Sequence, residues 1–260
     1  MFFFKKTVSK INLPYLEVQL VNHCNLNCRA CSHFSNIAEP YYYNIFDYEN
    51  DLKVIGQKFT LGILRLLGGE PLLHPDLIQI LKITRKYLPE TPITVVTNAV
   101  LLPEMNEQFF MTLKDENITV DISVYPLSKS VYEKSVKILE SYNIEYSLAK
   151  TDKFRLFFNP DRKSDYIKMF KKCILKRCRI LYKSKIYHCP ICACSEIYSD
   201  KFGVKLIKGS GIDFKNERNR NILLKFLTPQ ETCQYCDFES VKFSPWAISK
   251  AEPFEWSEYE

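Results

Sequence analysis

Short apolar runs alternate with amphipathic stretches from residue 16 to about residue 150. The apolar runs predict strands at residues 16–21, 63–67, 93–97, 120–125 and 146–149. The amphipathic stretches predict helices at residues 48–58, 76–87 (with Asp76 as the N-terminal cap), 104–113 and 130–142. Repeated strand–helix units are typical of a parallel sheet, in which functional residues gather at the carboxyl ends of the strands. We therefore expect an α/β protein built as an open or partial barrel.

The strand–helix alternation fades after Asn159-Pro160. A short hairpin is expected between residues 180–182 and 186–188, with its turn at Ser184. Seven of the ten cysteines lie between Cys173 and Cys236, which favours a smaller module organised by a metal. The expected organisation is a barrel at residues 1–160, a second module at 161–240 and a C-terminal tail at 241–260.

Composition narrows the class of protein. Apolar residues make up 46% of the chain and charged residues 25%, as in ordinary globular proteins. The net charge of +6 is modest for 260 residues, so no nucleic-acid partner is expected. No apolar run approaches the roughly 18 residues of a membrane helix, and Met1-Phe2-Phe3-Phe4 precedes the first lysines, the reverse of the charge order in a signal peptide. We expect a cytoplasmic protein without membrane contact, whose cysteines are metal ligands or reactive thiols and not disulfides.

Basic residues crowd residues 155–185, whereas the tail carries four glutamates. Three interpretations stay open for this basic stretch. It is a solvated face, a docking site for an acidic redox partner, or a site for a phosphorylated substrate.

Cys24, Cys28 and Cys31 have a C-x3-C-x2-C spacing just after the first long strand. A ferredoxin cluster takes four protein thiolates, but no fourth cysteine occurs before Cys173. Three thiolates would leave one iron of a 4Fe–4S cluster open to a substrate or cofactor, as in catalytic metal sites. The alternatives are three buried cysteines or part of a zinc knuckle. For His23, His33 and His74 an ordinary loop or supporting role is favoured over a ligand role.

With this motif after the first strand, the chain resembles the radical SAM enzymes, and most of its length takes part in the resemblance. The resemblance implies a partial (β/α)6 TIM-like barrel, in which Gly68-Gly69-Glu70-Pro71 corresponds to the family's GGEP motif. Glu70 would then receive the SAM amino group, and Thr97, Asn98 and Ser123 would make further SAM contacts. The family's chemistry is reductive cleavage of SAM to a 5′-deoxyadenosyl radical, which abstracts a substrate hydrogen. Ala30 stands where many members have an aromatic residue, so the adenine contact is expected from backbone or from His33 or Phe34.

The second cysteine set resembles the twitch form of the SPASM auxiliary-cluster domain. Its pattern matches Cys173, Cys189, Cys233 and Cys236, with Ser184 where the family has glycine. Four thiolates would close a second 4Fe–4S cluster, suited to electron transfer, although a zinc site has the same spacing. Cys178 competes with Cys173 as a ligand. Cys192 and Cys194 are left over as buried residues or as reactive thiols with a catalytic role.

The reaction is expected to be radical chemistry on a small polar substrate, because Cys24 comes too early to leave room for the leader-peptide domain of peptide-modifying members. Within the family, the arrangement is most similar to the aminoglycoside branch with 2-deoxy-scyllo-inosamine dehydrogenase and the neomycin epimerase. That similarity implies oxidation or epimerisation of a sugar or cyclitol, with flavodoxin or ferredoxin as the electron donor. A peptide- or protein-modifying enzyme is the first alternative, and a non-catalytic iron–sulfur or zinc interaction protein is a distant one.

Overall fold

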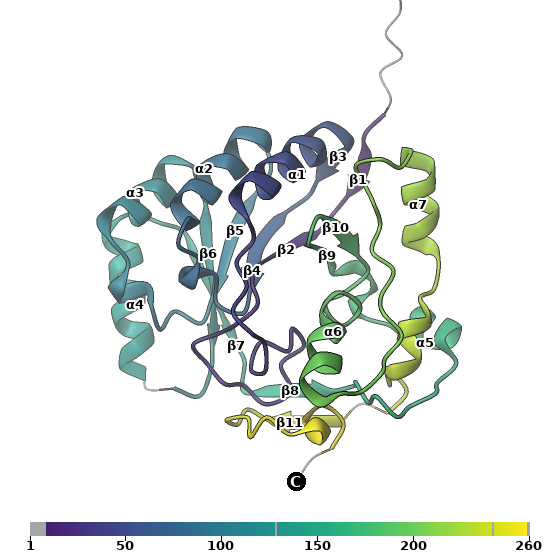
Figure 1. Ribbon diagram of the computed structural model, residues 1–260. Helices are drawn as coiled ribbons and strands as arrows, with labels where there is room; N and C mark the ends of the chain where they lie inside the picture. Colours follow the sequence, from purple (N-terminus) through teal and green to yellow (C-terminus); the bar gives the residue numbers. More distant parts are fainter. Residues whose placement is uncertain (1–8, 128, 241, 259–260) are drawn as a thin grey trace, which may run out of the picture.

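A seven-stranded sheet runs through the protein, as the computed structural model shows for residues 9–127, 129–240 and 242–258 (Figure 1). Its strand order is β10-β9-β2-β4-β5-β6-β7, and all neighbours are parallel except the antiparallel pair β9–β10. These strands are β2 (Leu16–Val21), β4 (Leu64–Gly68), β5 (Ile93–Thr97), β6 (Thr119–Val124), β7 (Tyr146–Lys150), β9 (Arg179–Tyr182) and β10 (Lys185–Tyr187). The mixed α/β fold with a largely parallel sheet is the class expected from the sequence.

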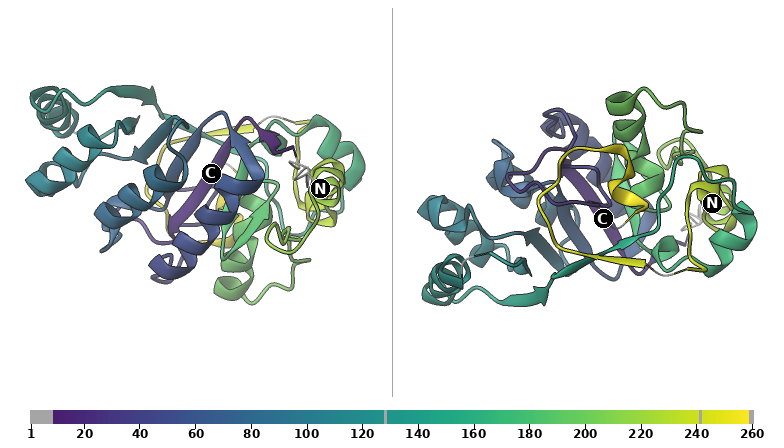
Figure 2. Two further views of the ribbon diagram at one scale, coloured as in Figure 1. Left: turned by 90° about the horizontal axis from the view of Figure 1, so that it is seen from above. Right: turned by 90° about the horizontal axis from the view of Figure 1, so that it is seen from below.

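Two small sheets complete the strands. β1 (Ile11–Leu13) pairs in parallel with β3 (Phe59–Leu61), and β8 (Lys153–Leu156) pairs antiparallel with β11 (Lys242–Pro245). The second pairing brings the end of the chain back to the segment that leaves β7. Residues 242–258, which we call the C-terminal strap, then cross the end of the sheet where the parallel strands finish (Figure 2).

Helices pack around this sheet in two groups (Figures 1 and 2). The first group is α1 (Ile45–Lys58), α2 (Leu77–Tyr87), α3 (Glu107–Asp115) and α4 (Lys129–Ser141). It covers one face of β2 and β4–β6 and encloses the larger apolar core. The second group is α5 (Tyr166–Lys172), α6 (Pro190–Phe202) and α7 (Asn219–Leu227), beside β9 and β10. A second apolar core joins α6 to residues 30–37 and to Trp256 of the C-terminal strap.

Local side-chain caps explain where the sequence-based boundaries shift. α1 begins three residues before the expected start because the Asn44 side chain accepts from the N–H groups of Phe46 and Asp47. The helix expected from residue 104 is wrong in its first turn: a short 3-10 turn ends at Glu104, and α3 starts at Glu107 under the Asn106 cap. Asp76 occupies the expected N-cap position of α2, but its side chain makes no capping hydrogen bond.

The hairpin β9–β10 turns at Lys183 and Ser184, which have φ values of +46° and +58°. Two consecutive left-handed residues define the tight turn that matches the twist of antiparallel strands. The Ser184 N–H donates to the Tyr43 hydroxyl over 2.9 Å. That hydroxyl in turn donates to buried Asp51, which pairs with Lys215. The turn is therefore fixed to α1 although it carries serine instead of glycine.

β9 lies in the same sheet as the first strands, because Leu16, Glu17 and Val18 of β2 pair with residues 179–181. The two expected modules thus share one sheet, and the boundaries at residues 160 and 240 stay predictions. Among the described residues, no helix has the length and apolar character to cross a membrane. The segment from Met1 to Phe4 lies outside the described residues.

Candidate functional site

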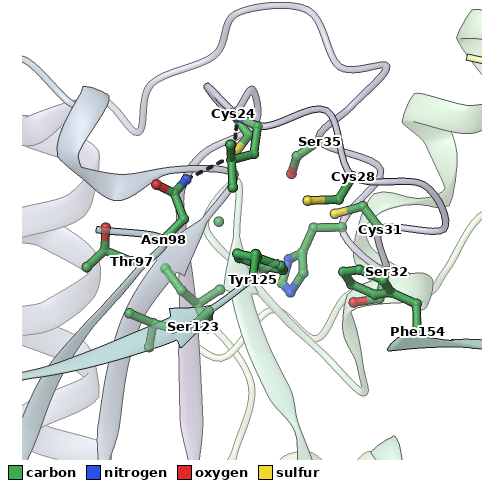
Figure 3. Close-up of a pocket in the computed structure, with 16 residues that line it drawn as sticks. Cys24, Cys28, Cys31, Ser32, Ser35, Thr97, Asn98, Ser123, Tyr125 and Phe154 are labelled. Carbon is green, nitrogen blue, oxygen red and sulfur yellow. Dashed lines mark hydrogen bonds between the residues drawn. The ribbon is translucent and has the colours of Figure 1, made fainter. Parts of the chain in front are cut away.

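A cavity of about 180 Å³ opens at the carboxyl ends of β4, β5 and β6 (Figure 3). Cys24, Cys28 and Cys31 all line it, from the segment that follows β2. We call residues 22–35 the cysteine loop. The same loop contributes Leu26, Ser32, His33 and Ser35. The strands and their ends contribute Leu67, Gly68, Gly69, Val96, Thr97, Asn98, Ser123 and Tyr125, with Phe154 from β8. The three thiols expected to act together are thus brought to one cavity.

Gly68 and Gly69 determine where the cysteine loop starts. Gly68 has φ +140°, and an added Cβ there would overlap the Val21 carbonyl. An added Cβ at Gly69 would overlap the His23 carbonyl and come within 2.8 Å of Asn22 O. The Gly69 N–H donates to Val21 O over 2.7 Å, so the end of β4 is in direct backbone contact with the end of β2. Both positions require glycine.

The C-terminal strap holds the cysteine loop from the other side. Arg29 N–H donates to Ala247 O over 2.9 Å, and Ser249 N–H donates to Asn27 O over 2.7 Å. Two indoles of the strap also contact the loop: Trp256 Nε1 donates to Cys31 O over 2.8 Å, and Trp246 Nε1 donates to Cys28 Sγ over 3.1 Å. The strap is therefore part of the site, although the sequence suggested only a tail.

The three thiols are soft metal ligands on a cavity wall that is partly shielded from solvent. Burial raises the pKa of the Cys28 thiol to about 11 and that of Cys24 well above its usual range. The Cys24 sulfur also accepts from Leu26 N–H at 3.4 Å and from Asn98 Nδ2 at 3.6 Å. Thiols in such surroundings ionise when a metal binds them, because the metal charge replaces the proton. The donor set, three cysteines on one cavity, fits an iron–sulfur cluster.

Glu70 joins two strand ends and does not line the cavity. Its side chain has no exposed surface, and burial raises its pKa to about 7. Oε1 accepts from Leu72 N–H at 3.1 Å and from Thr97 Oγ1 at 2.7 Å. Oε2 accepts from Asn98 N–H at 3.0 Å. The carboxylate thus fastens the turn after β4 to the end of β5, and contact with a SAM ammonium stays a prediction.

Asn98 and Ser123 both face the cavity (Figure 3). Asn98 Nδ2 donates to Asn25 Oδ1 over 2.7 Å, which ties the end of β5 to the cysteine loop. Beyond Ser123, the rings of Tyr125 and Phe154 stack with centroids 6.2 Å apart and an angle of 15°. The sequence analysis missed this aromatic wall, and the position of Tyr125 at the end of an expected strand was the available signal.

His33 and Phe34 were the side chains expected near an adenine. His33 lines the cavity and its Nδ1 lies 2.7 Å from Gln19 Oε1, while burial lowers its pKa to about 4. Phe34 is fully buried against Phe158 and Trp256 and does not line the cavity. The source of an adenine contact stays a prediction, for which His33 is the better-placed side chain of the two. His74 has a structural partner, with Nε2 2.9 Å from Tyr43 O.

Cys173, Cys189, Cys233 and Cys236 gather beside α5 and the start of α6. Burial raises the pKa of Cys236 well above its usual range, and the neighbouring charges of Cys233, Cys173 and Cys192 raise it further. Burial also raises the pKa of the Cys189 thiol, and the neighbouring charges of Cys192, Cys236 and Cys173 raise this pKa further. All ten cysteines are free thiols. Within the described ranges, no three or more Cys, His, Asp or Glu side chains are arranged to hold a single metal ion.

The two competing cysteines have different surroundings. The charges that act on the Cys178 thiol, after burial, belong to Glu17, Arg65 and Arg179. Cys173 is acted on by Cys233 and also by Cys178, and it is Cys173 that acts on Cys189 and Cys236. Geometry thus favours Cys173 as the fourth member of the set. Cys192 is a fifth thiol nearby: its N–H donates to Cys189 Sγ over 3.4 Å. The Cys189-x2-Cys192 spacing was a signal for this that the sequence analysis did not use.

Cys192 and Cys194 lie on α6, and neither lines the cavity. Their exposed fractions are 4% and 0%. Burial raises the pKa of Cys192 to about 11, which favours the neutral thiol. A catalytic role for either thiol stays a prediction.

Comparison with known proteins adds three findings. GTP 3′,8-cyclase from Clostridium botulinum (strain Hall) is 36% identical over 115 residues, which make up 43% of this chain and 35% of that protein. The enzyme of the same name from Petrotoga mobilis is 31% identical over 125 residues, 47% of this chain and 38% of that protein. This chain thus spans little more than a third of the length of these relatives.

A solved structure with a similar fold is BtrN in complex with AdoMet and 2-DOIA. Its TM-score is 0.53 at 15% identity, and the match covers 88% of this chain and 94% of BtrN. The likeness concerns the fold. The family model of the Radical SAM superfamily matches residues 18–156, more than half of the chain. The strand ends, the glycine pair and the three clustered thiols all lie inside that match, and the chain belongs to the radical SAM superfamily.

Proposed function

We propose that this chain is an enzyme that cleaves SAM reductively and acts on a small polar substrate, a carbohydrate or cyclitol, which it oxidises or epimerises. Membership of the superfamily implies a 4Fe–4S cluster and SAM as cofactors. The observation that carries the proposal is the single cavity lined by Cys24, Cys28 and Cys31 at the ends of three parallel strands. The carboxyl ends of such strands are where α/β folds bind their ligands.

Each group on the cavity wall has a part in this proposal. Cys24, Cys28 and Cys31 would hold the cluster through three irons, leaving the fourth open to SAM. When bound, the cluster and SAM would supply a 5′-deoxyadenosyl radical. The side chains of Asn98 and Ser123 offer polar contacts to SAM, and Gly68 and Gly69 offer exposed backbone. The stacked rings of Tyr125 and Phe154 keep water from the far wall, which protects a reactive intermediate.

The substrate class rests on the fold likeness to BtrN, whose structure contains AdoMet and 2-DOIA. That match runs over almost the whole of both chains. Modification of a peptide or protein is the alternative, and a non-catalytic iron–sulfur or zinc protein is a distant one. The partial match to GTP 3′,8-cyclases is a reason to include GTP among the compounds tested.

A second 4Fe–4S cluster would be held by Cys173, Cys189, Cys233 and Cys236. Their mutual proximity supports this choice over Cys178. Iron analysis distinguishes this proposal from a zinc site, because zinc in the purified protein at one equivalent would contradict it. We also propose a cytoplasmic location, in keeping with ten free thiols, which cell fractionation would test.

Whether the product is a ketone or an epimer depends on the group that reacts with the substrate radical. Hydrogen return, as in an epimerase, needs a thiol beside the substrate, whereas Cys192 and Cys194 are both buried and neither lines the cavity. A closed second cluster is an electron acceptor, which favours oxidation to a ketone. We therefore propose dehydrogenation as the reaction.

Deuterated water separates the two outcomes. With SAM, dithionite and a panel of sugars, cyclitols and GTP, we expect one product two hydrogens lighter than its substrate, with no deuterium on carbon. Mass spectrometry measures both the mass of the product and its deuterium content. An unchanged formula with one deuterium at an inverted carbon would establish epimerisation and contradict dehydrogenation.

Replacing Cys24, Cys28 and Cys31 together by Ala should remove about half of the iron from the reconstituted protein and abolish SAM cleavage. The reason is that no other soft ligands line the cavity among the described residues. Iron analysis and detection of 5′-deoxyadenosine check the two expectations. Continued SAM cleavage by the triple variant would refute the cluster assignment, and the variant Cys178→Ala, at a cysteine outside both proposed sites, should behave as wild type.

Glu70→Gln tests the proposed contact with SAM. A lost hydrogen bond to a charged group costs about 1.5–3 kcal/mol, so SAM binding should weaken about 10- to 150-fold while iron content is unchanged. Calorimetry measures the SAM affinity and iron analysis the cluster content. Unchanged SAM affinity in Glu70→Gln would mean that Glu70 only fastens β4 to β5 and would refute the ammonium contact.

The basic stretch is proposed to dock an acidic flavodoxin or ferredoxin. Its exposed part combines Lys171 and Arg177 with the apolar side chains of Tyr166, Ile167 and Ile174. Lys168 and Lys172 share Glu239. Reduction by such a partner should slow with rising ionic strength, since salt screens the attraction between opposite charges. Reduction by dithionite should change much less. Equal salt dependence with both reductants would mean that this face is only solvated.

A further inference from the structure

In the described part of the chain, Trp246 is the aromatic residue whose side chain donates a hydrogen bond to a cavity thiol. Nε1 donates to Cys28 Sγ over 3.1 Å, from a residue 218 positions away in the sequence. Cys28 is only 7% exposed, so water competes little for its sulfur. Short contacts from N–H groups to cysteine sulfur matter most where the sulfur carries charge, as it does when it ligates iron.

Trp246 is held in place from two sides. Just before it, β11 pairs with β8, so that Pro245 lies opposite Lys153. The Trp246 N–H donates to Asp152 O over 2.8 Å. Just after it, Ile248 forms a β-bridge with Cys28. These contacts fix the backbone on both sides of Trp246 and keep the residue beside the cysteine loop.

Neighbouring aromatic rings pack against the indole of Trp246. Its ring lies 6.3 Å from that of Tyr125, with an angle of 43° between them. Tyr125 in turn stacks on Phe154 of β8. Trp246 therefore sits at the meeting point of the aromatic wall and the thiols. An aromatic residue that served only for packing would contact the neighbouring rings but would not need to direct an N–H group at the sulfur.

We propose that Trp246 raises the reduction potential of the cluster that Cys28 ligates, by donating its indole N–H to the Cys28 thiolate. Reduction adds one electron, here from dithionite or a protein donor, and the added negative charge spreads onto the ligand sulfurs. A donated N–H stabilises that charge more in the reduced state than in the oxidised state, which raises the potential. Trp246 is thus a positioning and tuning residue and not a catalytic one. The inference rests on the proposed function through Cys28 as a ligand.

The test is a potentiometric titration of the reconstituted full-length protein, followed by electron paramagnetic resonance. The variant Trp246→Phe keeps an aromatic ring but loses the N–H. Its reduced-to-oxidised ratio at a fixed ambient potential should fall roughly tenfold, which is about 59 mV for one electron. The signal that changes on addition of SAM identifies this cluster and separates it from a second one.

The matched control is Trp256→Phe. Trp256 belongs to the same strap and also donates its indole N–H to the cysteine loop, but to the Cys31 carbonyl instead of a sulfur. Its loss should lower the melting temperature of the protein and leave the potential unchanged. A shift of equal size in both variants would show that loop distortion moves the potential and would overturn the proposal.

A second variant covers the case in which Trp246→Phe does not assemble its cluster. If Trp246→Phe assembles poorly, replacing Trp246 by benzothienylalanine keeps the bicyclic shape and removes only the N–H, with the same expected shift. An unchanged potential in a variant with full iron content overturns the role of Trp246. Failure of the proposed function is distinguishable, because the wild-type protein would then show no cluster signal that changes on addition of SAM.

Discussion

The backbone contact between the ends of β2 and β4 is the constraint on which the rest of the site depends. Gly69 lies so close to His23 that any side chain would overlap its carbonyl, and Gly68 adopts a backbone angle that other residues rarely accept. The contact sets the starting point of the cysteine loop and turns Glu70 toward the end of β5. A single substitution at Gly69 would displace the thiols, the carboxylate and the end of the sheet together.

A second support comes from the far end of the chain. The C-terminal strap adds two indole hydrogen bonds and a β-bridge to the cysteine loop. A loop after a strand is usually among the less stable parts of a fold. Here the cysteine loop lies between the glycine pair and the C-terminal strap, and its residue Phe34 packs in the second apolar core. Rigid support of this kind is what a site needs when its ligands must keep their spacing with and without a cofactor.

The sequence predicted the strand–helix order because the buried strands are short and the helices strongly amphipathic, and β5 was predicted to the residue. It also predicted that Cys24, Cys28 and Cys31 act together, since their spacing is local. It could not choose between Cys173 and Cys178, because that choice depends on which way a turn before β9 points. Trp246 was missed for a similar reason: only the pairing of β11 with β8 brings it to Cys28. Long-range pairing leaves little trace in local patterns.

The separation of 218 residues between Cys28 and Trp246 has a consequence for how the protein matures. The cysteine loop leaves the ribosome long before the strap that supports it, and contacts so distant in sequence form late in folding. During that interval the three thiols are exposed to oxidants and to stray metals. Iron–sulfur assembly in the cell must therefore either follow completion of the strap or act on a loop that is not yet supported. The time between synthesis of the two ends thus becomes a period in which the nascent chain is vulnerable.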